Sequence, residues 1–195
     1  MDTVMSGRVL VAEDEWITAT ALSRQLQSQG YHLVGLVGSG TAAVDSCRRE
    51  CPDVVLMDIR MPEMDGITAT RELMTTRPLP VVIVTGDASL KAQAEEAGAM
   101  AYVVKPVAPQ ALARTIAQAR ERFACYLEVR EQAGSHAEGL AAWAVVRTAL
   151  RAIVDRDGVS EPEAFDHLLQ RAAASGRTLR DESQEILDVP PPPLA

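Results

Sequence analysis

Four short apolar runs in this chain are each followed by side chains suited to phosphate chemistry. In chain order, these side chains are Glu13 and Asp14, Asp58, Thr85, and Lys105. A carboxylate at the end of a strand is a candidate nucleophile, and clustered acids attract a hard divalent cation such as Mg2+. The lysine and the cation would neutralise charge on a transferring phosphoryl group, and the hydroxyl would donate to it. The set predicts phosphoryl transfer to a carboxylate, with Asp58 as the phosphoacceptor.

Each of these residues taken singly is more simply explained as a polar loop residue that caps a strand. Two proline-containing pairs add to the pattern, because Met61-Pro62 lies in the turn after Asp58 and Lys105 is followed directly by Pro106. Acids, hydroxyl, lysine and prolines at successive run ends together favour one phosphate-handling site over a set of unrelated caps.

The site requires elements that bring these run ends together. Strands are predicted near residues 8–12, 32–37, 54–57, 81–84 and 101–104, with helices between them and a last helix after Pro109. Such Val, Leu and Ile runs are typical of a parallel sheet that is buried on both faces. With right-handed crossovers and a flavodoxin-like strand order, every candidate site residue lies at the carboxyl edge of the sheet. The predicted fold class is therefore α/β.

The first helix is predicted from Trp16 to Gln29, with Gly30 as a suitable C-cap. Its apolar positions at helical spacing are Ile17, Ala21, Leu22 and Leu26. We expect this stripe to face the core. Trp16 lies two residues after Asp14 and could shade the acids, although a partly buried packing role is favoured.

Residues 8–122 resemble the receiver domain of two-component response regulators. The resemblance rests on the strand-end residues and the proline pairs described above. It implies a CheY-like domain with a five-stranded parallel sheet, in which Asp58 accepts phosphate from a sensor histidine kinase. The implied Mg2+ ligands are Glu13, Asp14, Asp58 and the backbone carbonyl of Arg60.

The same resemblance implies a switch beside the phosphoacceptor. Thr85 is the switch hydroxyl, Tyr102 is the switch aromatic, and Lys105 pairs with the phosphate. The Lys105-Pro106 bond is expected to be cis, a form that is otherwise uncommon before proline. Arg60 and Asp87 flank the site, and we expect them to tune the lifetime of the phosphorylated state.

Composition is typical of a cytoplasmic protein rather than a membrane or secreted one. The 195 residues carry a net charge of −8. No apolar run approaches the roughly 18 residues of a membrane span, and there is no cationic and apolar leader. The three cysteines, at 47, 51 and 125, cannot complete a disulfide framework and lack zinc-site spacing.

The predicted parts of the chain are a receiver at 1–122, a helical linker at 123–139, a three-helix unit at 140–188 and a proline-rich disordered tail at 189–195.

Cap and turn signals divide the second unit into helices. These helices are expected at about 140–154, at 160–174 and from 178 onward. Gly158 and Gly176 supply the breaks, and Ser160 with Glu163 forms a capping box. Interruptions of the preceding linker are expected at Gly134, Ser135 and Gly139.

Residues 140–188 resemble the ANTAR domain of antitermination regulators. The matching pattern positions are Ala149, Ala164, Phe165 and Ala172. Members of that family bind paired hairpins in nascent RNA and prevent terminator formation, usually after a receiver dimerises on phosphorylation, so RNA hairpins and a second copy of the chain are the implied partners. The candidate RNA-binding residues are Arg147, Arg151, Arg171, Arg177 and Arg180. Trp143 and His167 are the candidates to stack an unpaired base, since Phe165 is expected in the core.

Two departures from that family leave other outputs open. Members usually carry Lys-Gly directly after the first alanine, where this chain has Leu150 and Arg151. From residue 130 onward, seven arginines stand against eleven acids, although RNA binding draws much of its affinity from neutralised phosphates. A helical unit that docks a protein partner is therefore an alternative.

A DNA-binding regulator is a weaker alternative, because the predicted helix from Glu161 to Ala174 has three acids against one arginine, and a recognition helix needs basic residues. An enzymatic output is not expected, since the segment after residue 140 shows no Cys/His cluster, paired acids or Gly-rich phosphate loop.

Overall fold

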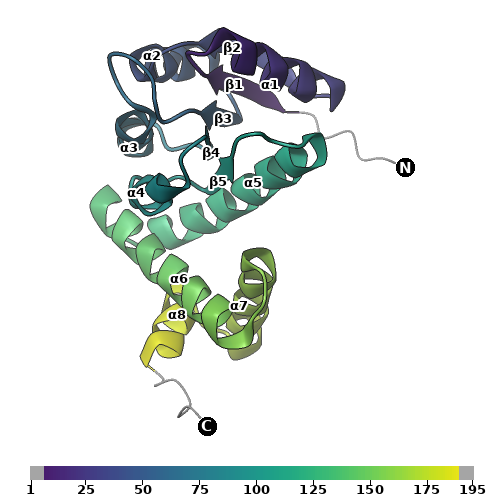
Figure 1. Cartoon of the computed structure of the whole chain (residues 1–195). Coiled ribbons are helices and arrows are strands. Elements are labelled where there is room, and N and C mark those ends of the chain that lie inside the picture. The colour runs from purple at the N-terminus through teal and green to yellow at the C-terminus, as the bar shows by residue number, and fades with distance from the viewer. Residues whose placement is uncertain (1–6, 189–195) are drawn as a thin grey trace. The chain divides into compact units, whose positions relative to one another are not determined.

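The structure is a computed structural model that describes residues 7–188, apart from the side chain of His136. The chain divides into two compact units after Phe123 (Figure 1). The predicted tail at 189–195 and the first six residues of the predicted receiver lie outside the described residues. Among the described residues, no helix is both long and apolar enough to cross a membrane.

The first unit is built on a five-stranded parallel sheet with the strand order β2-β1-β3-β4-β5. The strands are β1 (Arg8–Ala12), β2 (His32–Val37), β3 (Val54–Met57), β4 (Val81–Thr85) and β5 (Ala101–Val104). The helices are α1 (Trp16–Ser28), α2 (Gly40–Glu50), α3 (Gly66–Thr76), α4 (Lys91–Glu96) and α5 (Pro109–Glu131), with the 3-10 turn η1 (Ala88–Leu90) before α4. The five predicted strands and the flavodoxin-like, CheY-like order are thus confirmed.

Helices cover both faces of this sheet. Leu10, Val55 and Ile83 belong to one core cluster with residues of α2, α3 and α4. Figure 1 shows these three helices on one side of the sheet, with α1 and α5 on the other. The side-chain amide of Gln29 donates to the Pro109 carbonyl at 2.6 Å, which links the end of α1 to the start of α5. Strands β3 and β4 are buried along their whole length because both faces are covered.

The first turn of α1 corrects two expectations. Leu22 and Leu26 are buried as predicted, but the side of Ile17 and Ala21 faces solvent. Ile17 is 76% exposed and Trp16 is 72% exposed, so Trp16 has no packing role in this unit. Helical phase explains Ile17 and Ala21, because the buried stripe begins at Ala19 and a residue two positions away lies roughly half a turn around the helix. Trp16 is the first residue of α1 and precedes that stripe.

The second unit contains three complete helices. They are α6 (His136–Asp157), α7 (Glu161–Ser175) and α8 (Leu179–Asp188). Gly158 and Gly176 end α6 and α7 in the left-handed conformation, with φ of 66° and 68°, which glycine adopts without strain. The predicted capping box is present, since the Ser160 N–H donates to the Glu163 carboxylate at 2.8 Å.

The small residues of the predicted pattern lie where these helices pack. Ala149 and Ala164 are fully buried, and Phe165 and Ala172 are also in the core. Ile186 brings the apolar side of α8 into the same core. Small side chains at such positions allow close helix packing, as expected from the sequence.

The segment predicted as a linker, 123–139, is mostly regular helix. Helix α5 continues to Glu131, where Tyr126 is buried and its ring meets that of Trp143 edge to face, with centroids 6.1 Å apart. The break falls near Gly134 and Ser135 as predicted, but Gly139 lies inside α6. A Cβ at Gly139 would come within 3.0 Å of the Arg130 side chain, so close approach of α5 and α6 explains this glycine.

A buried carboxylate joins α7 to α8. Glu182 is 3% exposed, and it accepts hydrogen bonds from Arg171 Nε at 2.8 Å and from the Ser175 hydroxyl at 2.9 Å. Arg177 Nη1 lies 3.9 Å from the same carboxylate and also pairs with Glu185. The hydrogen bond from Arg171 is the largest cause of a pKa of Glu182 below its ordinary value. The paired, ionised form is therefore the one that stabilises the fold.

We expect Glu182→Gln to destabilise the second unit by about 1–2 kcal/mol at neutral pH, because charge-assisted hydrogen bonds are lost while Arg171 stays partly solvated. A carboxyl whose folded pKa is lowered contributes its stability above the ordinary glutamate pKa of about 4.3 and loses it as the pH falls through the folded value. The difference between wild type and variant should therefore shrink under acid.

The measurement is urea unfolding of the full chain, followed by circular dichroism between pH 7 and pH 3. Glu185→Gln is the matched control, because Glu185 is half exposed and pairs only with Arg177 among the described residues, and it should change stability little. If the difference in unfolding free energy between wild type and Glu182→Gln stays constant from pH 7 to pH 3, the ionised, paired form of Glu182 is not what stabilises the fold.

Candidate phosphorylation site

Asp58 is held at the carboxyl edge of the sheet by backbone hydrogen bonds between neighbouring strand ends. Its N–H donates to the Ala12 carbonyl at 2.8 Å, which fixes the end of β3 against the end of β1. The Glu13 N–H donates to the Val37 carbonyl at 2.8 Å and fixes β1 against β2 in the same way. Glu13 and Asp58 are consequently both buried, at 4% and 6% exposed, on adjacent strand ends.

The turn after Asp58 depends on a glycine. The Gly66 N–H donates to the Ile59 carbonyl at 2.9 Å, and a Cβ at Gly66 would lie 1.9 Å from the Asp58 carbonyl oxygen. No other residue fits there without moving the backbone that carries Asp58. Helix α3 starts at this glycine, capped by the Asp65 carboxylate, which accepts from the Thr68 N–H at 2.8 Å.

Three carboxylates meet at this edge. Glu13, Asp14 and Asp58 each offer an oxygen within 4.8 Å of the others, and Asp14 is the exposed member. Asp58 Oδ1 is buried and accepts no hydrogen bond from the part of the chain that the structure describes. A buried acceptor that lacks a donor suits a bound cation, and carboxylate oxygens are the ligands that Mg2+ prefers. The residues present therefore fit the predicted ion.

Lys105 is the cation of the site. Its Nζ lies 2.5 Å from Glu13 Oε2 and 3.4 Å from Asp58 Oδ1, so it pairs with both acids but hydrogen-bonds only to Glu13. The Lys105 N–H donates to the Thr85 carbonyl at 2.8 Å, which aligns the ends of β4 and β5. Thr85 is 1% exposed. The Lys105-Pro106 bond is cis, as expected.

The electrostatic balance of the site is negative. Three carboxylates stand beside one ammonium group. Burial raises the pKa of Glu13 above its ordinary value, Asp58 reinforces that rise, and the hydrogen bond from Lys105 opposes it. A site with more negative than positive groups gains from a divalent cation, which would relieve the repulsion between Glu13 and Asp58.

A further ion pair joins the loop after β3, which starts at Asp58, to the loop after β4, which follows Thr85. Arg60 Nη2 lies 2.7 Å from Asp87 Oδ2, and the Tyr102 hydroxyl donates to the Asp87 carbonyl. Hydrogen bonds from Ser89, followed by that from Arg60, hold the pKa of Asp87 below its ordinary value. Arg60, Asp87 and the half-buried Tyr102 thus form one connected group beside Asp58. A metal-binding role for the Arg60 carbonyl stays a prediction.

The five arginines predicted to bind RNA are placed very differently. Arg171 and Arg177 are committed to Glu182, and Arg147 is half-buried. Arg151 on α6 and Arg180 on α8 are exposed, and within residues 7–188 Arg180 forms no ion pair. Two of the five are therefore already paired with acids, and an RNA-binding role for the set stays a prediction.

Sequence reasoning missed the acid that holds two of these arginines. Glu182 lies four residues before Ile186, the buried apolar position of α8. This helical spacing was the available signal that Glu182 points inward. Of the predicted stacking rings, Trp143 is only 2% exposed, whereas His167 is exposed.

Comparisons with known proteins agree with this geometry. Residues 9–117 match the family model described as "Response regulator receiver domain". Over 188 residues, 95% of this chain and 91% of that protein, the chain is 35% identical to the transcriptional regulatory protein PdtaR of Mycobacterium tuberculosis.

Two solved structures are similar to the first unit. The signal receiver domain of a modulated diguanylate cyclase from Desulfovibrio desulfuricans G20 is 30% identical, with a TM-score of 0.57, and covers 60% of this chain and 96% of its own. The receiver domain of sensor histidine kinase PA1611 from Pseudomonas aeruginosa PAO1, solved with a magnesium ion in its active site cleft, is 30% identical, with a TM-score of 0.55 and coverage of 60% and 98%. With its sheet order, its acidic edge and the match over more than half of its length, the chain belongs to the response regulator receiver domain family.

Proposed function

We propose that this chain is a phosphorylation-dependent regulator in which a sensor histidine kinase transfers phosphate to Asp58. The observation that carries the proposal is the buried Asp58 Oδ1, which accepts no hydrogen bond from any described residue and lies 3.4 Å from the Lys105 ammonium group. In the reaction, a carboxylate oxygen attacks phosphorus, an O–P bond forms and the N–P bond of a phosphohistidine breaks. The leaving imidazole stays with the kinase.

The residues around Asp58 have distinct roles in this step. Lys105 moves from pairing with carboxylates to pairing with a phosphoryl oxygen, and the Thr85 hydroxyl donates to another. Glu13, Asp14 and Asp58 would hold Mg2+, which supplies positive charge against the equatorial phosphoryl oxygens when bound. The exposed Trp16 and Ile17 form an apolar surface two residues past Asp14, where a kinase can pack.

Phosphorylation would reach the output through the β4–β5 side of the receiver. A phosphoryl group that recruits Thr85 alters the loop in which Asp87 pairs with Arg60 and accepts from Tyr102. Val104 on β5 is 45% exposed and lies on this side. Its burial against a second copy of the chain would stabilise a homodimer of the phosphorylated form.

For the second unit we propose RNA binding that controls transcription antitermination. Support comes from the buried family-pattern residues, from the likeness to a transcriptional regulatory protein over 95% of the chain, and from the exposed Arg151 and Arg180. A protein-docking output is the second candidate, because Glu182 and Glu185 neutralise two of the predicted RNA-binding arginines. Neither candidate requires the second unit to be an enzyme.

We expect Asp58→Asn to abolish phosphate uptake from acetyl phosphate with Mg2+, because an amide is not a nucleophile of this kind. Intact-protein mass spectrometry would follow the added phosphoryl group. Glu63→Gln changes an exposed acid in the same turn and should leave uptake unchanged. Uptake by Asp58→Asn at the wild-type rate would show that the phosphoacceptor is another residue.

We expect Arg60→Ala and Asp87→Ala each to shorten the lifetime of the phosphorylated protein several-fold. Loss of the 2.7 Å ion pair would free the two loops beside Asp58 and ease the approach of water. The double variant should be no faster than the single ones, because both remove the same interaction. Phosphate release measured after removal of the donor tests this, and unchanged lifetimes in both single variants would contradict it.

We expect the beryllofluoride- and Mg2+-activated chain to bind an RNA with two adjacent short hairpins more tightly than a scrambled RNA. Arg151→Ala and Arg180→Ala should each weaken binding and reduce the salt slope by roughly one unit, whereas Arg177→Ala should do less. Arg24→Ala, an exposed arginine on α1, is the control. If the chain binds no hairpin RNA with or without beryllofluoride and Mg2+, RNA binding is wrong and the protein-docking function is favoured.

A further inference from the structure

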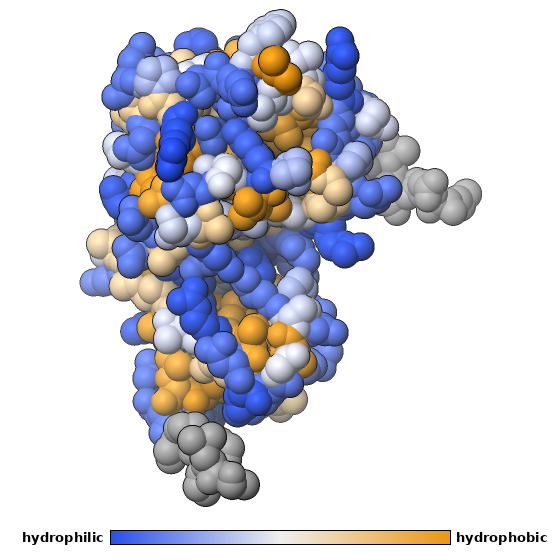
Figure 2. All heavy atoms as spheres, viewed as in Figure 1, coloured by the Kyte–Doolittle hydropathy of each residue, from blue (hydrophilic) through white to orange (hydrophobic). Residues whose placement is uncertain are grey.

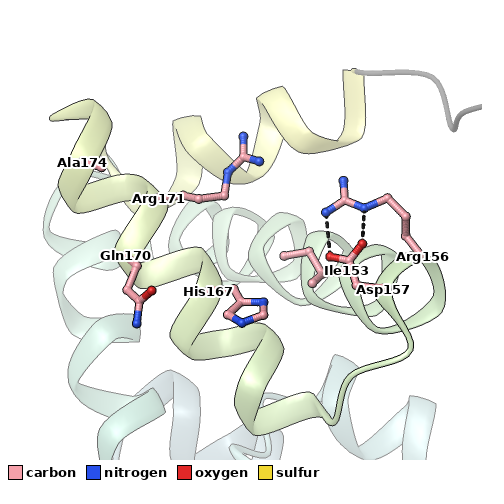
Figure 3. A pocket seen from close by; sticks show the side chains of 7 residues that line it. All are labelled: Ile153, Arg156, Asp157, His167, Gln170, Arg171 and Ala174. Carbon is pink, nitrogen blue, oxygen red and sulfur yellow. Dashed lines mark hydrogen bonds and ion pairs between the residues drawn. The ribbon is translucent and has the colours of Figure 1, made fainter.

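A hollow of about 320 Å3 opens between the end of α6 and the outer side of α7 (Figure 3). Its lining residues are Ile153, Arg156, Asp157, His167, Gln170, Arg171 and Ala174. Figure 3 shows the His167 ring and Ile153 lying between α7 and the Arg156–Asp157 pair. Ile153 is only 1% exposed, so its side chain forms the apolar bottom of the hollow. None of these residues belongs to the phosphorylation site.

His167 is the ring of the second unit that a ligand can reach. Tyr126 and Trp143 pack against each other in the core, and Phe165 is 3% exposed. Among the described side chains of residues 124–188, His167 is therefore the only exposed ring. An imidazole beside the apolar bottom of the hollow offers a face on which a flat, uncharged ring can stack.

The charges around the hollow cancel. Arg156 donates from Nε and Nη2 to both oxygens of Asp157, at 2.7 and 2.8 Å, so that pair is neutral. Arg171 is balanced by Glu182, and within residues 7–188 it donates only from its Nε, so its two terminal amino groups can donate to a ligand. A free phosphate would gain little net attraction here. A neutral ring with acceptor atoms at its edge would gain stacking and hydrogen bonds.

We propose that this hollow takes the base of one unpaired nucleotide from an RNA hairpin loop, stacked on His167 and hydrogen-bonded at its edge by Arg171. The inference rests on the RNA-binding function proposed above and adds the site that reads a base. The volume lies within the range of ligand pockets, which starts at about 300 Å3, so the hollow has room for one base. Exposed arginines outside the hollow would contact RNA phosphates. The hollow itself would distinguish an intact hairpin loop from a loop that lacks the base at one position.

The test uses the activated full-length chain and a two-hairpin RNA, together with versions in which single loop nucleotides are made abasic. For wild type, one abasic position should weaken binding about tenfold, as expected for the loss of one stacked base. His167→Ala should weaken binding to the intact RNA by a similar factor and bind the abasic RNA no worse than wild type does. Its salt slope should equal that of wild type, because no phosphate contact is lost. His32→Ala, an exposed histidine on β2, is the matched control and should change nothing.

The outcomes separate this inference from the function on which it rests. If wild type binds hairpins but His167→Ala binds them equally well, the base site is wrong and RNA binding stands. A reduced salt slope in His167→Ala would also overturn the base site, because it would show a phosphate contact. If wild type binds no hairpin in either state, both proposals fail together, and the second unit docks a protein instead. Circular dichroism of His167→Ala, an exposed position, confirms that the variant is folded.

Discussion

The buried carboxylate of Asp58 is the constraint on which the first unit depends. A carboxylate away from water is costly unless charge or hydrogen bonds compensate it, and one oxygen of Asp58 accepts no hydrogen bond within residues 7–188. Lys105, on the next strand but one, supplies the compensation while leaving that oxygen open to react. Only a parallel sheet with aligned carboxyl ends brings the two together, and Gly66 is needed to keep the turn close behind Asp58.

The buried acid of the second unit, in contrast, accepts hydrogen bonds from neighbouring side chains. Glu182 is saturated by Arg171, Ser175 and the nearby Arg177, so its role is to hold α7 and α8 together. A satisfied buried carboxylate contributes to stability, whereas an unsatisfied one is available for chemistry. Among the described residues, donors therefore satisfy the buried acid of the second unit, whereas the buried Asp58 of the first unit keeps one oxygen without a hydrogen bond.

The ion pairs of the second unit limit which arginines could contact RNA. Figure 2 shows hydrophilic side chains over much of one face of the molecule, yet a hydrophilic surface is not a basic one. Because acids hold Arg171 and Arg177, the RNA-binding function proposed above leaves the exposed Arg180 for phosphate contacts and the hollow beside His167 for a base. A net charge of −8 further limits nonspecific binding, so recognition must come from placed side chains.

The sequence by itself determined the five strands, the residues at their ends and the helix breaks at Gly158 and Gly176, because those signals are local. Period, turn chemistry and caps depend on neighbours in the chain. Tertiary structure alone decided that Trp16 is exposed, that Gly139 lies inside α6 rather than in a break, and that Glu182 pairs with two arginines. The physical reason is that burial and ion pairing depend on which surface lies opposite a side chain, and spacing along one element does not supply that information.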